Sequence, residues 1–159
     1  MALALGELAP DFTLKTREDG QNRDITLSAH RGKENVVLLF FPGAFTPVCT
    51  AELCDVSGGI EQYKGLNAVV YGVSTDSPYS LEAWAKQAGI TIPLLSDYKQ
   101  EVTRAYDVLW PDFSGLGPSS ARAVVVIDKN GIVKHTEQTP TLLDLPDLEK
   151  VKLVLAGIG

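Results

Sequence analysis

Two cysteines, Cys49 and Cys54, lie five residues apart and are the only cysteines in the 159-residue chain. They close the stretch FFPGAFTPVCTAELC, which spans residues 40–54. If Cys49 lies in the first turn of a helix, unpaired backbone N–H groups and the helix dipole favour its thiolate, the nucleophilic form of cysteine. The pattern therefore indicates a reactive thiol. The alternative is a small buried residue that does no chemistry.

Pro42 and Thr46 favour the reactive interpretation. Pro42 ends the preceding apolar run, lacks an N–H group and shapes a narrow wall above the start of the helix. The hydroxyl of Thr46, one turn before Cys49, can point at the same volume as a donor or as an acceptor. The side chains of Pro42 and Thr46 are therefore expected to lie around the sulfur of Cys49.

A buried strand and a helix must hold these residues in place. The continuously apolar run at residues 36–41 predicts a central strand that is buried on both faces. A helix is predicted over residues 46–65, with Thr46 as its cap and Pro47 at its first position. Cys49 is thus expected at the carboxyl end of a buried strand, where open α/β sheets place their ligands.

The rest of the chain alternates strand and helix patterns. Two hairpins are predicted, one with strands at residues 11–16 and 23–28, and one around Asn130-Gly131 within residues 121–138. The other elements are a strand, three helices and a long polar loop, expected at residues 66–76, 77–89, 99–109, 142–157 and 110–122, respectively. The last helix is expected to face the core with four apolar side chains, namely Leu145, Leu148, Val151 and Leu155.

This order of elements predicts an α/β fold, with a central mixed β-sheet flanked by helices and an N-terminal β-hairpin. The length of 159 residues fits one domain over residues 1–159. The net charge is −6 and no basic cluster is present, so a nucleic-acid partner is not expected. No signal peptide or membrane-spanning run is apparent, which predicts a cytoplasmic protein with no membrane partner.

The sequence gives no support for a metal or a phosphate-bearing cofactor. His30 and His135 lie far from the cysteines, and the paired short spacings of a zinc site are absent. No glycine-rich phosphate loop follows a strand. We therefore expect neither a metal site nor a phosphate-binding loop.

The motif Pro42-x-x-x-Thr46-x-x-Cys49 resembles the active-site motif of the peroxiredoxins, which are thiol peroxidases with a thioredoxin-like fold. Further landmarks follow in the family's order: APDF near the N-terminus, IPLLSD at residues 92–97, and Arg122 entering a strand that ends VID. CTAELC is similar to the bacterioferritin-comigratory, or Q-type, subfamily, and FFPGAFT is similar to alkyl hydroperoxide reductase E. The resemblance covers nearly the whole chain and implies no metal or organic cofactor.

The resemblance also implies a role for each motif residue. Cys49 would attack a peroxide and become a sulfenic acid, which Cys54 would then resolve as a disulfide. Thr46 would orient the peroxide, and Pro42 would screen the sulfenic acid from water. Arg122 would stabilise the thiolate and the developing negative charge; without the resemblance, it would be taken for a surface cation.

Four further residues are weaker candidates. Glu52 either holds Arg122 in place or faces solvent from the helix. The aromatic residues Phe45, Trp110 and Phe113 are proposed as an apolar collar for organic hydroperoxides. Trp84 is expected to anchor its own helix in the core.

The spacing of the cysteines has a structural consequence. On an intact helix, residues five apart have Cα atoms roughly 8–9 Å from each other, beyond the usual disulfide range. A bridge between Cys49 and Cys54 therefore requires local unwinding. Gly58 and Gly59 either weaken the helix and ease this opening, or mark a helix that simply ends near Ser57.

The predicted function is a thiol-dependent peroxidase that reduces hydrogen peroxide and organic hydroperoxides, with thioredoxin or a similar dithiol as the reductant. A monomer or weak homodimer is expected, since resolution within one chain needs no partner. Two alternatives stay open. One is a general thioredoxin-type disulfide oxidoreductase, which normally uses Cys-x-x-Cys, and the other is a non-catalytic thiol redox sensor.

Overall fold

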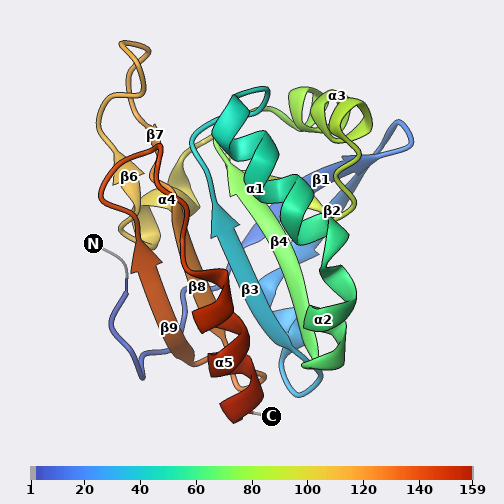
Figure 1. Cartoon of the computed structure of the whole chain (residues 1–159), viewed down its shortest axis with the longest axis vertical. Helices are drawn as coiled ribbons and strands as arrows, with labels where there is room; N and C mark the ends of the chain where they lie inside the picture. Colours follow the sequence, from blue (N-terminus) through green and yellow to red (C-terminus); the bar gives the residue numbers. More distant parts are fainter. Residues whose placement is uncertain (1–2, 159) are drawn as a thin grey trace.

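A seven-stranded mixed sheet forms the centre of the computed structural model, which describes residues 3–158 (Figure 1). The strand order is β2-β1-β5-β4-β3-β8-β9, and β6 pairs with β7 in a separate ladder. The strands are β1 (Thr13–Glu18), β2 (Gln21–Thr26), β3 (Asn35–Phe40), β4 (Ala68–Ser74), β5 (Leu94–Ser96), β6 (Leu109–Trp110), β7 (Ser119–Ser120), β8 (Ala123–Ile127) and β9 (Val133–Gln138). The helices are α1 (Pro47–Gly58), α2 (Ile60–Gly65), α3 (Pro78–Ala88), α4 (Glu101–Ala105), α5 (Leu148–Ile158) and the short 3-10 helix η1 (Leu27–His30).

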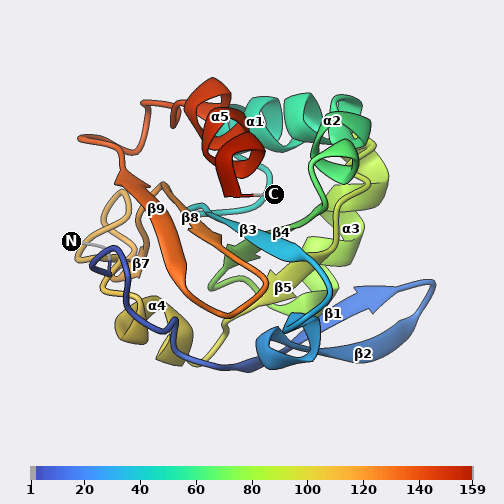
Figure 2. The same cartoon turned by 90° about the horizontal axis from the view of Figure 1, so that it is seen from below.

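Strand β3 is buried on both faces, as its apolar run predicts. Val36, Leu38 and Phe40 pack into one core, and Val37 and Leu39 pack into the other. Helices α1, α2, α3 and α5 cover one face of the sheet, while α4 and the N-terminal segment cover the opposite face (Figure 2). Strand β3 therefore provides a rigid base for the loop and helix that follow it.

The sheet mixes parallel and antiparallel pairs, as predicted. Strand β4 pairs in parallel with both β3 and β5. The other neighbouring strands of the main sheet pair in the antiparallel sense. The carboxyl ends of β3 and β4 consequently meet at one edge, where the cysteine-bearing helix begins.

Both predicted hairpins are present. The second turns at Asn130-Gly131, where Gly131 has φ = 83° and its N–H donates to the carbonyl of Asp128. The first has a tighter tip than expected, because Asp19 and Gly20 both have positive φ values and form a two-residue turn. Such a turn matches the twist of the paired strands. Strands β1 and β2 are therefore six residues long, as predicted, but each lies two residues closer to the tip than the sequence pattern suggests.

The single helix predicted over residues 46–65 is wrong in one respect, because it is divided into α1 and α2 at Gly59. The N–H of Gly59 donates to the carbonyls of Asp55 and Val56, both at 3.1 Å. The interpretation that the helix ends near Ser57 is closer to the structure, although α2 follows directly. Helix α4 is also shorter than the helix predicted at residues 99–109.

Other differences concern short elements. The strand β5 was not expected, and the loop at residues 110–122 begins within β6 and carries β7. Leu145 is 53% exposed and lies before α5, contrary to the expectation that it faces the core. Val151 and Leu155 are buried as predicted, and Leu148 is partly buried against the same core.

None of the helices within residues 3–158 combines the length and the apolar character that a bilayer-spanning segment needs.

Candidate active site

The site begins where β3 ends. Residues 41–46 form a loop that leads directly into α1, with Pro47 in the first turn and Thr46 as the residue before the helix. Thr46 has extended backbone angles, φ = −90° and ψ = 147°, as expected at this position. Cys49 is the third residue of α1 and lies in its first turn, which is the placement predicted from the sequence.

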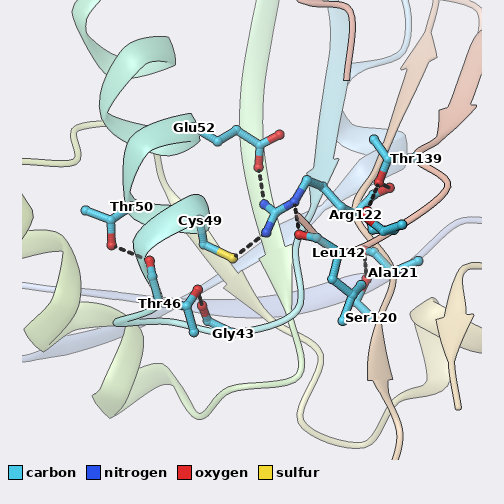
Figure 3. Close-up of polar contacts among 11 residues, drawn as sticks. Gly43, Thr46, Cys49, Thr50, Glu52, Ser120, Ala121, Arg122, Thr139 and Leu142 are labelled. Carbon is cyan, nitrogen blue, oxygen red and sulfur yellow. Dashed lines mark hydrogen bonds and ion pairs between the residues drawn. The ribbon is translucent and has the colours of Figure 1, made fainter. Parts of the chain in front are cut away.

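Cys49 is fully buried, with an exposed fraction of 0%, and it is a free thiol in this structure. Its Sγ atom accepts a hydrogen bond from Nη2 of Arg122 at 3.1 Å (Figure 3). These residues are 73 positions apart in the sequence. A hydrogen bond from a guanidinium stabilises a thiolate more than a thiol, because the donor carries a positive charge.

Arg122 lies just before β8 and is 1% exposed, so it is not the surface cation that its sequence context alone suggests. Three of its nitrogen atoms have acceptors: Nη2 donates to Cys49, Nη1 donates to Oε1 of Glu52 at 3.0 Å, and Nε donates to the carbonyl of Leu142 at 2.9 Å. These contacts fix the plane of the guanidinium on three sides (Figure 3).

Glu52 is buried beside Arg122, which is the first of the two placements considered for it. Its Oε1 atom accepts from the guanidinium, while its Oε2 atom is buried without a hydrogen-bond partner. Burial raises the pKa of Glu52 to about 7, although the charge and hydrogen bond of Arg122 act in the opposite direction. When Glu52 is protonated, its carboxylate no longer offsets the positive charge of Arg122, so the guanidinium stabilises a thiolate at Cys49 more strongly.

This pKa predicts a pH-dependent stability that a Glu52→Gln variant should lack. Between pH 4.5 and 7 the folded state keeps a proton that the unfolded state has lost, so the free energy of unfolding decreases as the pH rises through this window. Across this window, we expect ionisation of Glu52 to lower the free energy of unfolding of the wild-type protein by about 3 kcal/mol relative to Glu52→Gln. Urea unfolding of both proteins at several pH values measures it, and parallel pH profiles would contradict the prediction.

Pro42 and Thr46 lie beside Arg122 at a pocket of about 400 Å³. The hydroxyl of Thr46 donates to the carbonyl of Gly43 at 2.8 Å, so its remaining hydrogen-bonding capacity is as an acceptor (Figure 3). The full lining consists of Pro42, Thr46, Pro47, Val48, Phe113, Ser114, Arg122, Leu142 and Leu143. Cys49 is not among these residues, but its sulfur is hydrogen-bonded to Arg122, which does line the pocket.

The structure separates the three aromatic residues that were proposed as a collar. Phe113 lines the pocket, and its ring lies against Gly43. Phe45 instead contacts the ring of Trp84, with centroids 6.5 Å apart. Trp110 packs against the core on the other face of the sheet.

Cys54 lies on the same wound helix as Cys49 and is half-buried. Its Sγ atom donates to the carbonyl of Ala88 at the end of α3, at 3.3 Å. The two sulfur atoms therefore have different neighbours, Arg122 for one and α3 for the other. Because both cysteines lie within α1, a bond between them requires this helix to open.

A further contact ties the first turn of α1 to α3. The hydroxyl of Thr50 donates to the carbonyl of Thr46 at 2.8 Å and accepts from Nε1 of Trp84 at 3.0 Å. Trp84 is buried, as expected of a core anchor. If α1 unwinds around Thr50, the buried indole N–H loses this acceptor. The contact therefore stabilises the wound form of α1 and opposes its opening.

The histidines lie apart from the cysteine site. His30 belongs to η1, and its Nε2 atom is 2.8 Å from the hydroxyl of Tyr71, while His135 belongs to β9. Across the described part of the chain, no group of three or more histidine, cysteine, aspartate or glutamate side chains is arranged to hold a metal ion.

Sequence reasoning missed two groups around the site. The backbone carbonyl of Leu142 accepts a hydrogen bond from Arg122. Every residue has such a carbonyl, so the residue type at position 142 could not predict this contact. Asp76 accepts a hydrogen bond from the N–H of Ala44, in the loop before α1, at 2.9 Å. Its position after a buried strand beside β3 was a usable signal, because the carboxyl ends of neighbouring parallel strands share one edge.

Known proteins resemble this chain in both sequence and fold. A 2-cysteine peroxiredoxin of Chattonella marina var. antiqua is 38% identical over 143 residues, covering 86% of this chain and 71% of that protein. Alkyl hydroperoxide reductase E of Mycobacterium tuberculosis is 35% identical over 137 residues, covering 85% of each.

Solved structures agree with these relatives. The reduced 2-Cys peroxiredoxin of Plasmodium vivax superimposes with a TM-score of 0.85 at 30% identity, over 95% of this chain and 79% of that one. Peroxidoxin BcpB of Mycobacterium tuberculosis gives a TM-score of 0.82 at 28% identity, over 98% and 97%. These structures confirm the predicted thioredoxin-like α/β fold with its mixed central sheet and flanking helices.

The family model described as the AhpC/TSA family matches residues 5–136. This segment contains both cysteines and Arg122, together with the loop that carries Pro42 and Thr46. The chain therefore belongs to the AhpC/TSA family of peroxiredoxins, as its motif indicated.

Proposed function

We propose that this chain is a thiol-dependent peroxidase that reduces hydrogen peroxide and organic hydroperoxides at Cys49. The observation that carries the proposal is the 3.1 Å hydrogen bond from the buried guanidinium of Arg122 to the sulfur of Cys49. Relatives named alkyl hydroperoxide reductase E and thioredoxin peroxidase support it, the latter from Echinococcus granulosus and 35% identical over 153 residues.

In the first step, the thiolate of Cys49 attacks one oxygen of the peroxide. The S–O bond forms as the O–O bond breaks, which gives a sulfenic acid and releases the other oxygen as water or an alcohol once it takes a proton. The hydroxyl of Thr46, whose own hydrogen is held by Gly43, accepts from the peroxide O–H. The N–H groups of Arg122 stabilise the charge that develops on the leaving oxygen.

In the second step, the thiol of Cys54 attacks the sulfenic sulfur and water leaves, so that a disulfide joins the two residues. This step requires α1 to unwind, because both cysteines lie within it. An external dithiol then reduces the disulfide, and a thioredoxin-like protein is the proposed donor. Pro42 at the pocket wall shields the sulfenic acid from water in the interval.

The Thr50–Trp84 contact should slow the second step. A Thr50→Val variant keeps the shape of the side chain but loses both hydrogen bonds, so the wound form of α1 is weakened. We expect disulfide formation to become about tenfold faster, with little change in the first oxidation. Stopped-flow fluorescence and rapid-quench mass spectrometry separate the two steps.

Trp84→Phe is the matched control for this prediction, because it keeps an aromatic ring and removes the indole N–H. Trp84→Phe removes only the bond to Trp84 and leaves the bond from Thr50 to Thr46, so it should accelerate disulfide formation by a smaller factor than Thr50→Val. The double variant should be no faster than Thr50→Val alone, because that change already removes both bonds. If the rate of disulfide formation is unchanged in both single variants, the contact between Thr50 and Trp84 does not slow the opening of α1.

We further propose that the protein works in the cytoplasm as a monomer or weak homodimer. Resolution by Cys54 in the same chain supports this assembly, since no second chain is needed to supply a thiol. Peroxide and the reductant are the proposed partners.

A turnover assay tests the proposed function. Purified protein is mixed with hydrogen peroxide and a thioredoxin system, and peroxide loss is followed. A peroxidase consumes many equivalents per chain, whereas a non-catalytic sensor stops after one. A general disulfide oxidoreductase reduces a disulfide substrate such as insulin without peroxide, so insulin reduction with no peroxide consumption would overturn the proposal.

A further inference from the structure

The loops that follow β3 and β4 share one hydrogen-bond network. The two strands pair in parallel with Phe40 opposite Val73, and the N–H of Phe41 extends the ladder to the carbonyl of Val73 at 3.0 Å. The loop after β3 carries Thr46, and the loop after β4 carries Asp76. A side chain on the second loop is therefore placed to set the position of the first.

Asp76 is itself firmly held before it reaches across. Its N–H donates to Oγ of Ser74 at 3.2 Å, and its carbonyl accepts from the hydroxyl of Ser96 at 2.6 Å. These two contacts tie it to the ends of β4 and β5. Its Oδ2 atom then accepts two hydrogen bonds, from the hydroxyl of Ser74 at 2.7 Å and from the N–H of Ala44 at 2.9 Å.

The segment that Asp76 holds contains an unfavourable backbone conformation. Phe45 has φ = 64°, a left-handed conformation that is uncommon for an aromatic residue and persists only where its surroundings impose it. On one side the N–H of Ala44 is bound by Asp76. On the other side the hydroxyl of Thr46 is bound to the carbonyl of Gly43. If the contact between Ala44 and Asp76 is lost, the backbone of Phe45 can return to a more favourable conformation. Because Thr46 is the next residue, this change would move its hydroxyl.

We propose that Asp76 is a positioning residue for the reaction at Cys49, which holds the Thr46 hydroxyl in its accepting orientation through the Ala44 amide and the strained turn at Phe45. This inference rests on the proposed peroxidase function. The carboxylate acts as a sheet-anchored acceptor and reaches the chemistry through the backbone of residues 44–46. The acceptor oxygen, more than the charge, carries the effect.

The test measures the second-order rate constant for oxidation of Cys49 by hydrogen peroxide in reduced protein. Asp76→Ala should lower it by about tenfold to a hundredfold, since small displacements of a positioning group have effects of this size. Asp76→Asn keeps an acceptor oxygen and should restore it to within about fivefold of wild type. In a Thr46→Val background, Asp76→Ala should cause no further decrease, because both changes remove the same contact to peroxide.

Ser77→Ala is the control for a general loosening of the loop after β4. Ser77 accepts from the N–H of Ser80 at the start of α3, so its loss weakens the loop while the bond to Ala44 remains. This variant should oxidise at the wild-type rate. The proposal is overturned if Asp76→Ala reacts like wild type, if Asp76→Asn is as slow as Asp76→Ala, or if Asp76→Ala slows the Thr46→Val protein by its full factor. Failure of wild type itself to react with peroxide would instead count against the proposed function.

Discussion

Replacement of Cys49 by serine is expected to abolish the reaction with peroxide. The serine hydroxyl is far less acidic than a thiol, so the anion that attacks the O–O bond is not populated, and Arg122 has no thiolate to stabilise. The rate constant for oxidation of the protein by hydrogen peroxide should fall by several orders of magnitude, to the level of a thiol that no active site activates. Stopped-flow measurement with excess hydrogen peroxide gives the rate, and mass spectrometry gives the site.

Cys54→Ser is the matched control, because it removes a sulfur from the same helix without touching Arg122. This variant should react once at the wild-type rate and gain the mass of one oxygen atom on Cys49, or of two with further oxidation. Equal oxidation of the Cys49→Ser and wild-type proteins would assign the reactive thiol to Cys54 and remove Cys49 from the mechanism.

The second large effect is expected from Arg122→Ala. This change removes the charged donor to Cys49 and leaves the buried Glu52 without its partner. Loss of a preorganised donor at a site of developing charge lowers rates by about 10² to 10³. The rate of the first oxidation should fall by this factor, while disulfide formation from a preformed sulfenic acid should change much less.

Arg122→Lys distinguishes charge from geometry. Lysine keeps the positive charge but cannot offer three fixed donors to Cys49, Glu52 and the carbonyl of Leu142. We expect a rate between those of the alanine variant and wild type. Thermal unfolding must accompany the kinetics, since breaking a buried ion pair destabilises a protein by about 3–5 kcal/mol. A first oxidation that is as fast in Arg122→Ala as in wild type would exclude the guanidinium from the chemistry.

Local patterns predicted the parts of the fold that depend on local physics. The apolar run of β3 and the Asn130-Gly131 turn are recognisable because burial and turn geometry select those residue types directly. The division between α1 and α2 was left open, since a glycine pair can weaken a helix or end it. The Arg122–Cys49 contact spans 73 positions, and the family resemblance suggested it where local pattern did not.

The error at Leu145 has a physical cause that also explains a missed contact. Pro146 follows it, and a proline inside a helix has no N–H to offer the carbonyl four residues earlier. Helix α5 therefore begins only at Leu148. The carbonyl four residues before Pro146 is that of Leu142, which instead accepts from Nε of Arg122. The apolar periodicity of residues 142–157 predicted a helix through this point because periodicity does not register a missing donor.

The break at Gly59 bears on how the proposed cycle resets. The C-terminal end of α1 is held independently of the cysteine site, because Val56 is buried and Oγ of Ser57 accepts from the N–H of Thr91 at 3.0 Å. A surviving last turn spares the chain the nucleation of a new helix, which is the slow and unfavourable part of helix formation. After reduction, residues 49–54 can add back onto this template one at a time, so recovery is a matter of propagation.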